Sequence, residues 1–212
     1  MDNFNLSFEH QQRRKNGKTK IVHNRVQFKE GKLFDKEGNE YQGNNKFLSD
    51  ALVSLIYLKQ NDADKNNVDN KSTIDELVKT KEKIFINQRD FAKNDDYGAK
   101  NIFWNPKAAF EVFDLKDKNK SLGVQSAALQ LGHELGHAYM NVFYGVQDLK
   151  FDKKTYGKET GTTLNDRENF IVQNFEVPMA RRLPGEAIRV NYDQRREPIT
   201  PKGPTSTEKE NQ

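Results

Sequence analysis

The stretch from Ser121 to Tyr144 constrains the fold of this chain more than any other, because it predicts a long helix with a buried face. Its apolar residues recur at the three- and four-residue spacing that places side chains on one side of a helix. These residues are Val124, Ala128, Leu131, Leu135, Ala138 and Val142. Gly145 follows directly, and glycine is the residue that most often ends a helix in the left-handed conformation. We therefore expect a core helix over residues 121–144.

Two histidines and a glutamate lie in the middle of this predicted helix. His133 and His137 are four residues apart, so they share a face, about 6 Å from one another, and can direct both imidazoles at a single ion. Glu134 is rotated by about 100° around the helix, which makes it a poor third ligand. It can instead reach a water molecule beside the ion. This is the division of labour in HExxH zinc peptidases, whose glutamate is the general base.

The composition and the surroundings of the motif support a metal at this position. The neighbouring Leu131-Gly132 and Ala138-Tyr139 carry no formal charge, and burying three ionisable groups among them without a partner would be costly. The chain has no cysteine, so a transition metal must be held by imidazole and carboxylate groups. The other two of its four histidines, His10 and His23, lie in polar, basic surroundings and are not expected to be ligands.

A catalytic zinc ion takes a third protein ligand and leaves one position open. The long metzincin form of the motif would need a histidine at position 143, which is Phe143 here. A second helix is predicted to begin near Thr163 or Asn165, and its buried stripe carries a carboxylate. The stripe consists of Glu168, Ile171, Val172 and Phe175. A buried glutamate needs a cation, so Glu168 is the predicted third ligand.

Other acidic residues stay open as the third ligand. Asp166 is the first alternative, followed by Asp148 and Asp152. A purely structural explanation of Glu168 is an acid in the first helical turn, where the helix dipole favours negative charge. Pro178 is expected to end or kink this second helix.

Two residues near the end of the chain are candidates for stabilising a reaction intermediate. Hydrolysis of an amide creates an oxyanion, which needs hydrogen-bond donors in addition to a metal. Arg189 and Tyr192 are three residues apart and offer a guanidinium and a hydroxyl group. We expect them to be the oxyanion donors, although such residues near a chain end more often lie on the surface.

The remaining chain predicts an α+β fold, a small sheet packed on the helices. Residues 1–19 are polar and basic and are expected to be a flexible lead-in. Residues 20–197 are expected to form a single domain with its core in residues 101–193, and residues 198–212 a disordered tail.

Within the domain, local patterns predict the elements. Strands are expected at 20–28, 32–35, 39–42, 84–86, 101–104 and 110–113. A helix from Asn45 or Ser49 to Lys59 is expected to bury Leu52, Leu55 and Ile56, and a short helix is expected over 72–81. The polar stretch 61–71 indicates an exposed loop. The strand at 101–104 or 109–113 is expected to form the edge of a cleft and to bind an extended peptide.

The residues from Leu131 to Tyr139 resemble the active-site helix of the NleD-like effector zinc metallopeptidases. Those domains occur as injected bacterial effectors and as C-terminal toxin domains of Rhs-repeat proteins. Their pattern continues with an acidic helix, a Glu-Asn pair, and then an arginine and a tyrosine. The matching residues here are Glu168, Glu176, Arg182, Arg189 and Tyr192, in that order. Val177 replaces the family's asparagine, which leaves the role of Glu176 open.

The resemblance covers residues 101–193 and implies a gluzincin-like zincin. The clostridial neurotoxin proteases are similar in arrangement, with a downstream glutamate ligand and then Arg-x-x-Tyr. The resemblance implies a zinc endopeptidase that hydrolyses proteins of a target cell as an effector or toxin. Its expected partners are a protein or peptide substrate and, as a further candidate, a cognate immunity protein.

The chain is expected to be secreted or delivered into a target cell, although its first residues lack the features of a signal peptide. No membrane partner is expected, because the longest apolar run, Ala51 to Leu58, is too short to span a bilayer. Nucleic acid is not the expected partner either. Two alternatives stay open: a nucleic-acid-targeting toxin, which the net charge of +4 would suit, and a catalytically inactive zincin that acts as a binding module.

Overall fold

The structure is a computed structural model that describes residues 4–13, 19–88, 96–98, 101–145, 164–194 and 196–210. Several residues considered above lie outside the described part, either entirely or in their side chains. They are Asp148, Asp152, Thr163, Asp166, His10 and His23. The fold is mixed α+β, as predicted, with two sheets and the helices packed beside them. Among the described residues, no helix combines the length and apolarity needed to cross a bilayer.

The larger sheet has six strands in the order β3-β2-β1-β4-β6-β5. The strands are β1 (Phe4–Arg13), β2 (Thr19–Lys29), β3 (Lys32–Phe34), β4 (Ile84–Gln88), β5 (Asp96–Gly98) and β6 (Asn101–Trp104). Strand β1 pairs antiparallel with β2 and parallel with β4, so residues 4–13 lie inside the sheet. The predicted flexible lead-in is therefore wrong for these residues. Their alternation of Phe4, Leu6 and Phe8 with polar residues is a strand pattern that the basic residues after it obscure.

The smaller sheet has three strands in the order β8-β7-β9, namely β7 (Ala109–Phe113), β8 (Ser121–Gln125) and β9 (Arg196–Ile199). Strand β9 pairs with β7, and Pro201 forms a bridge with Lys209, so the disorder predicted from residue 198 is wrong for residues 198–210. The expectation of a cleft edge is also wrong, because β6 and β7 each have a partner strand on both sides.

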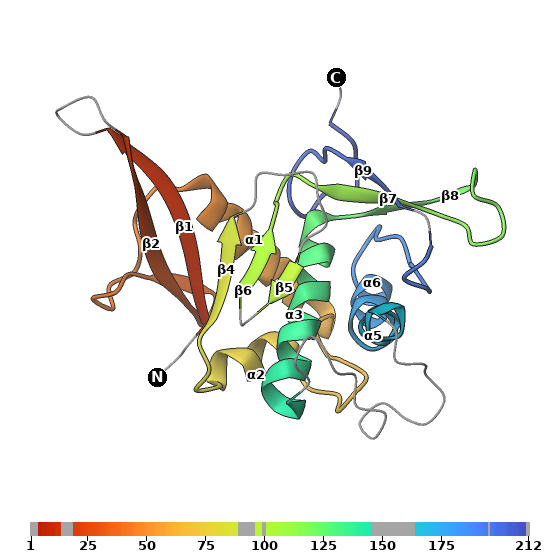
Figure 1. The fold of residues 1–212 in the computed structure, drawn as a ribbon, viewed down its shortest axis with the longest axis horizontal. Helices are drawn as coiled ribbons and strands as arrows, with labels where there is room; N and C mark the ends of the chain where they lie inside the picture. Colours follow the sequence, from red (N-terminus) through yellow and green to blue (C-terminus); the bar gives the residue numbers. More distant parts are fainter. Residues whose placement is uncertain are drawn as a thin grey trace.

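The central helix α3 (Ala127–Tyr144) lies beside the larger sheet, with α5 (Leu164–Ile171) and α6 (Val177–Arg182) on its other side (Figure 1). It begins later than predicted, because residues 121–125 form β8 and the Ser126 side chain accepts the N–H of Leu129 as the N-cap. Its C-terminus follows the prediction, since Gly145 has φ 67° and its N–H bonds Asn141 O.

Two further helices cover α3 from the N-terminal half of the chain. Helix α1 (Lys46–Lys59) is capped by Asn45, and α2 (Thr73–Lys79) by Ser72, as their sequences predicted. The buried face of α1 differs from the prediction, because Ile56 is exposed and Leu52 only half-buried. The apolar residues that α1 does bury are Phe47, Leu48, Ala51, Leu55, Tyr57 and Leu58.

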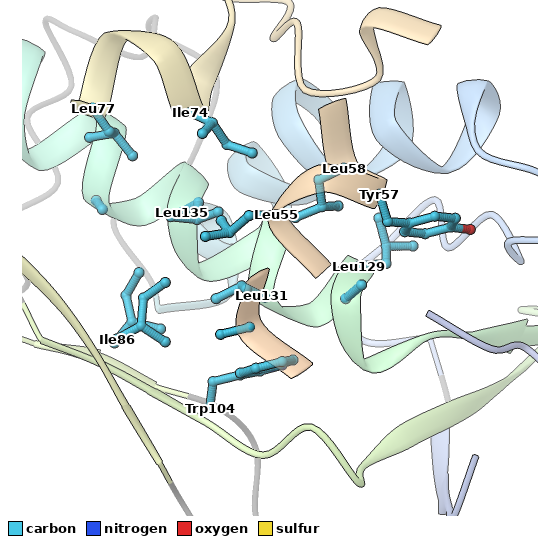
Figure 2. Close-up of a cluster of buried hydrophobic side chains, with 14 of the residues drawn as sticks. Leu55, Tyr57, Leu58, Ile74, Leu77, Ile86, Trp104, Leu129, Leu131 and Leu135 are labelled. Atoms are coloured by element: carbon cyan, nitrogen blue, oxygen red, sulfur yellow. The ribbon is translucent and has the colours of Figure 1, made fainter. Parts of the chain in front are cut away.

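The hydrophobic core forms where α1, α2 and α3 meet the sheet (Figure 2). Leu131 and Leu135 of α3 point towards Leu55 of α1, while Ile86 and Trp104 reach them from β4 and β6. The indole of Trp104 donates a hydrogen bond of 2.8 Å to the carbonyl of Ala127 and so joins the sheet to the first turn of α3. This packing fixes the height and rotation of α3, which carries the candidate site.

Candidate metal centre

Three side chains from α3 and α5 converge on one point in the interior. The Nε2 atoms of His133 and His137 are 3.2 Å apart, and each is 3.1 Å from Oε2 of Glu168. All three residues are buried. Ligands of a tetrahedral zinc ion with bonds of 2.0–2.1 Å are about 3.3 Å apart, so the spacing and the donor set fit such an ion. The buried group of His133, His137 and Glu168 can hold a metal ion.

The helix carrying Glu168 can approach α3 because α3 presents glycine to it. A Cβ atom at Gly136 would lie 2.8 Å from Cγ of Phe175, and one at Gly132 would lie 2.5 Å from Sδ of Met179. Both contacts are shorter than atoms normally tolerate. The two glycines therefore set how closely Glu168 can come to the histidines.

We expect Gly136→Ala to destabilise the fold by about 1–3 kcal/mol through overpacking against Phe175. Helix propensity alone predicts the opposite sign, a gain of about 1 kcal/mol. Urea unfolding of the variant measures the difference. Gly203→Ala is the matched control, since its Cβ would meet nothing within 4 Å. A Gly136→Ala protein as stable as the control would show that the close approach is not needed.

A π-helical turn, η2 (Val172–Glu176), joins α5 to α6 and aligns two carboxylates. Eight residues of a regular α-helix make about 2.2 turns, so Glu176 would be rotated by about 80° from Glu168 around the helix. A π turn holds more residues, because its hydrogen bonds run to the fifth residue. Glu176 therefore returns to the same side, and both carboxylates contact His133, at Nε2 and Nδ1 respectively.

Pro178 gives a physical reason for this turn. Proline has no N–H and cannot bond the carbonyl of Asn174, while the N–H of Val177 bonds Val172 O in the π pattern. The freed carbonyl of Asn174 accepts the N–H of Asn67 at 2.9 Å instead. The helix neither ends at Pro178 nor is left with an unpaired carbonyl at Asn174.

Asn67 belongs to the polar stretch 61–71, whose predicted exposure is wrong in part. Asp64 and Asn66 are buried, and Asp69 accepts the hydroxyl of Tyr139 at 2.7 Å. Arg182, which the family resemblance placed among the site residues, donates to the carbonyl of Lys65 at 2.6 Å in the same stretch. It therefore holds this loop and does not reach the metal ligands.

Glu176 orients the imidazole of His133 through Nδ1, the nitrogen that faces away from Glu168 and His137. Its Oε2 lies 2.9 Å from Nδ1 of His133, and its Oε1 accepts hydrogen bonds from Gln125 at 2.7 Å and Arg189 at 2.9 Å. Burial disfavours charge on both partners, yet the carboxylates of Glu168 and Glu176 outweigh it and raise the pKa of His133 to about 9. The pKa of Glu176 is lowered despite burial, chiefly by the charge of Arg189. A carboxylate on the outer nitrogen fixes the tautomer that a metal requires.

Arg189, one of the two predicted oxyanion donors, is buried against Glu176. Its side chain is 0% exposed, and its Nε and Nη2 both bond the carboxylate of Glu176. The structure therefore favours a positioning role for Arg189 through Glu176 and His133. Tyr192 packs under the Arg189 guanidinium, which lies 5.3 Å from its ring centroid. Burial raises the pKa of Tyr192, and its backbone N–H donates to Oδ1 of Asn169, the residue after Glu168, at 2.6 Å.

Four further polar side chains near the centre were not predicted from the sequence. They are Gln125, Gln130, Arg167 and Arg196. Gln130 lies one turn before Glu134 on α3, and this spacing was the only local signal. Nη2 of Arg167 is 3.0 Å from Nδ1 of His137. A metal-binding His137 would carry its proton on that nitrogen, so Arg167 would have to turn away on metal binding.

A further buried carboxylate, that of Glu186, anchors the start of α3. It accepts the N–H of Ser126 at 2.8 Å and the hydroxyl groups of Ser126 at 2.5 Å and Tyr57 at 3.1 Å. Burial raises its pKa from 4.5 to about 7, although these hydrogen bonds oppose the shift. The folded state therefore holds a proton that the unfolded state has released between these two pH values.

We expect the stability contributed by this proton to be present below pH 4.5 and lost as the pH rises through about 7, a change of about 2–4 kcal/mol. Glu186→Gln should remove the slope. Free energies of unfolding measured from pH 4.5 to 8 test this, and the difference between wild type and variant isolates Glu186 because all other groups titrate in both. Parallel pH profiles would contradict the assignment.

The site thus combines a buried ligand triangle, an adjacent glutamate on α3 and a carboxylate held by an arginine behind one ligand. Such a group can bind a divalent metal and place a base beside it. Comparison of the chain with models of protein families, with curated proteins and with solved structures finds no match.

Proposed function

We propose that this chain is a zinc-dependent endopeptidase with a zincin-like fold, related in its site to the NleD-like effector metallopeptidases. The observation that carries the proposal is the triangle of His133, His137 and Glu168 with edges of 3.1, 3.1 and 3.2 Å, two of its corners from an HExxH helix. Nitrogen and carboxylate donors in this number are those of catalytic zinc sites with one open position.

In the proposed reaction, a bound zinc ion supplies Lewis acidity towards water and the scissile carbonyl. Glu134, the neighbour of His133 on α3, takes a proton from the attacking water and delivers it to the leaving amine. The hydroxyl of Tyr192 donates to the oxyanion. Glu176, held by Arg189, keeps His133 in its orientation. The proposed setting is a bacterial effector or toxin domain acting on target-cell proteins, with an immunity protein as a candidate partner.

Metal content and proteolysis, measured on the same preparations, test the proposal. We expect the wild type to retain a zinc ion through dialysis and to create new protein N-termini in target-cell lysate. His137→Ala should lose both properties, because a site with two ligands binds zinc far more weakly. His23→Ala, which removes a histidine from β2, should keep both. Wild-type protein without zinc, or unchanged cleavage by His137→Ala, would overturn the proposal.

A further inference from the structure

Arg196 lies close to the proposed catalytic residues without belonging to the metal site. Arg196 is the first residue of β9 and pairs with Val112 of β7. Its guanidinium lies over the ring of Phe110, 4.6 Å from the centroid, and its Nη1 donates to Oε1 of Gln130 at 2.6 Å. Gln130 precedes Glu134 by four residues on α3, so the two side chains lie on the same face, about 6 Å apart. Arg196 therefore reaches the helix face that carries the proposed general base.

The acceptor for Arg196 is held in place by a chain of hydrogen bonds. Gln130 Nε2 donates to Gln125 Oε1 at 3.1 Å, and Gln125 Nε2 donates to Glu176 Oε1 at 2.7 Å. Because each amide nitrogen is used as a donor, Oε1 of Gln130 must face Arg196. The same chain ends on Nδ1 of His133 through Glu176. This chain of hydrogen bonds thus fixes the position of Arg196 relative to the metal ligand His133.

Among the described residues, no carboxylate hydrogen-bonds to Arg196, although the charges of Glu176 and Glu134 act on it from a greater distance. Among the residues that the structure describes, its only hydrogen bond goes to the neutral Gln130. The nearby Arg189 is already neutralised by Glu176. Burial and the charge of Arg189 lower the pKa of Arg196 to about 10, although the carboxylates of Glu176 and Glu134 oppose the shift. Arg196 is partly exposed, so an anion that arrives from solvent can meet Nε and Nη2, the donors that do not bond Gln130.

We infer that Arg196 recognises a carboxylate of the peptide substrate, close to the bond that is cut. This inference rests on the proposed function and names the substrate chemistry that the site selects. The planar fork of an arginine matches a carboxylate, the anion that an unmodified peptide carries. Gln130, which bonds Arg196, lies one helical turn (about 6 Å) from Glu134, a spacing that corresponds to one to two residues of an extended peptide. The carboxylate belongs either to an acidic side chain at that distance or to the chain terminus.

Cleavage of a defined peptide library by the zinc-loaded protein tests the inference. The library holds peptides that differ only by Glu or Gln at each position around the cut, each made with a free and with an amidated C-terminus. We expect wild type to favour Glu over Gln at one fixed position by about 10–100-fold in kcat/KM, mainly through KM. Preference for the free over the amidated end would instead identify the terminus as the source.

Two variants separate recognition from a structural role. Arg196→Gln should remove the preference while keeping zinc content, and Arg196→Lys should keep the charge and part of the preference. A residue that only supports the fold would lower cleavage of the Glu and Gln peptides equally, which would overturn the inference. Because Arg196→Lys retains the cation, it decides the question even if Arg196→Gln does not fold.

Binding provides a readout that does not depend on turnover. Fluorescence anisotropy of labelled Glu and Gln heptapeptides is measured with Glu134→Gln and with Glu134→Gln/Arg196→Gln. A Glu preference that needs Arg196, without any cleavage by wild type, would support the recognition site and overturn the proposed reaction. Cleavage without a carboxylate preference would do the reverse. Absence of both binding and cleavage would overturn both.

Discussion

Glu134→Gln is expected to keep zinc and to lose peptide hydrolysis by about 10²–10⁴-fold, the usual contribution of a general base. Glutamine has nearly the same shape as glutamate but cannot accept a proton from water. Since Glu134 is not one of the three converging ligand residues, metal content should stay at the wild-type level. The measurement is kcat/KM on a cleaved peptide together with zinc content by mass spectrometry.

The matched control is Glu37→Gln, the same change in an exposed turn after β3, which should leave both quantities unchanged. Loss of zinc in Glu134→Gln would make Glu134 a ligand and would invalidate the proposed ligand set. Unaltered hydrolysis would remove it from the mechanism. A protein that binds zinc and peptides but cleaves none, in wild type and variant alike, would be the inactive zincin of the alternative interpretation.

Arg189→Met is expected to cost about 3–5 kcal/mol of folding free energy, because it leaves the buried carboxylate of Glu176 without its cation. Arg189 and Glu176 are 0% and 1% exposed, so water cannot replace the lost partner. Zinc affinity should also fall, by about 10–100-fold, because Glu176 no longer holds His133 firmly. Urea unfolding and a competition titration with a zinc chelator measure the two effects.

The double variant Glu176→Gln/Arg189→Met should be more stable than Arg189→Met, because the unpaired charge is gone. This result separates the positioning role from the oxyanion role that the sequence alone suggested. An oxyanion donor would lower kcat while leaving stability and zinc affinity near the wild-type values. The latter outcome would restore the original interpretation of Arg189.

Elements whose signals are local could be predicted from the sequence. The caps at Asn45 and Ser72 and the end of α3 at Gly145 follow from residue types within one turn of the helix end. The pairing of His133 with His137 follows from the helical repeat. The placement of Glu168 on a buried stripe rests on the same repeat and does not depend on knowing which elements touch.

Predictions of structure failed where the local sequence pattern was weak or where contact with a distant segment determined the structure. The basic residues that follow strand β1 obscured its strand pattern. The polar composition after residue 198 obscured the pairing of β9 with β7. The polar stretch 61–71 is partly buried because Asn67 finds the carbonyl that Pro178 leaves free. No local rule connects those two residues.

The sequence by itself determined the chemistry of the motif, namely two imidazoles on one helix face with a glutamate beside them, because helical geometry fixes distances between near neighbours. Only the tertiary structure decided what surrounds them. It brings Glu176 to Nδ1 of His133 across 43 residues of sequence and buries Arg189 behind it. It also sets Arg196 against Gln130, 66 residues away in the chain. Contacts at such separations depend on how whole elements pack, which the spacing of residues along the chain does not encode.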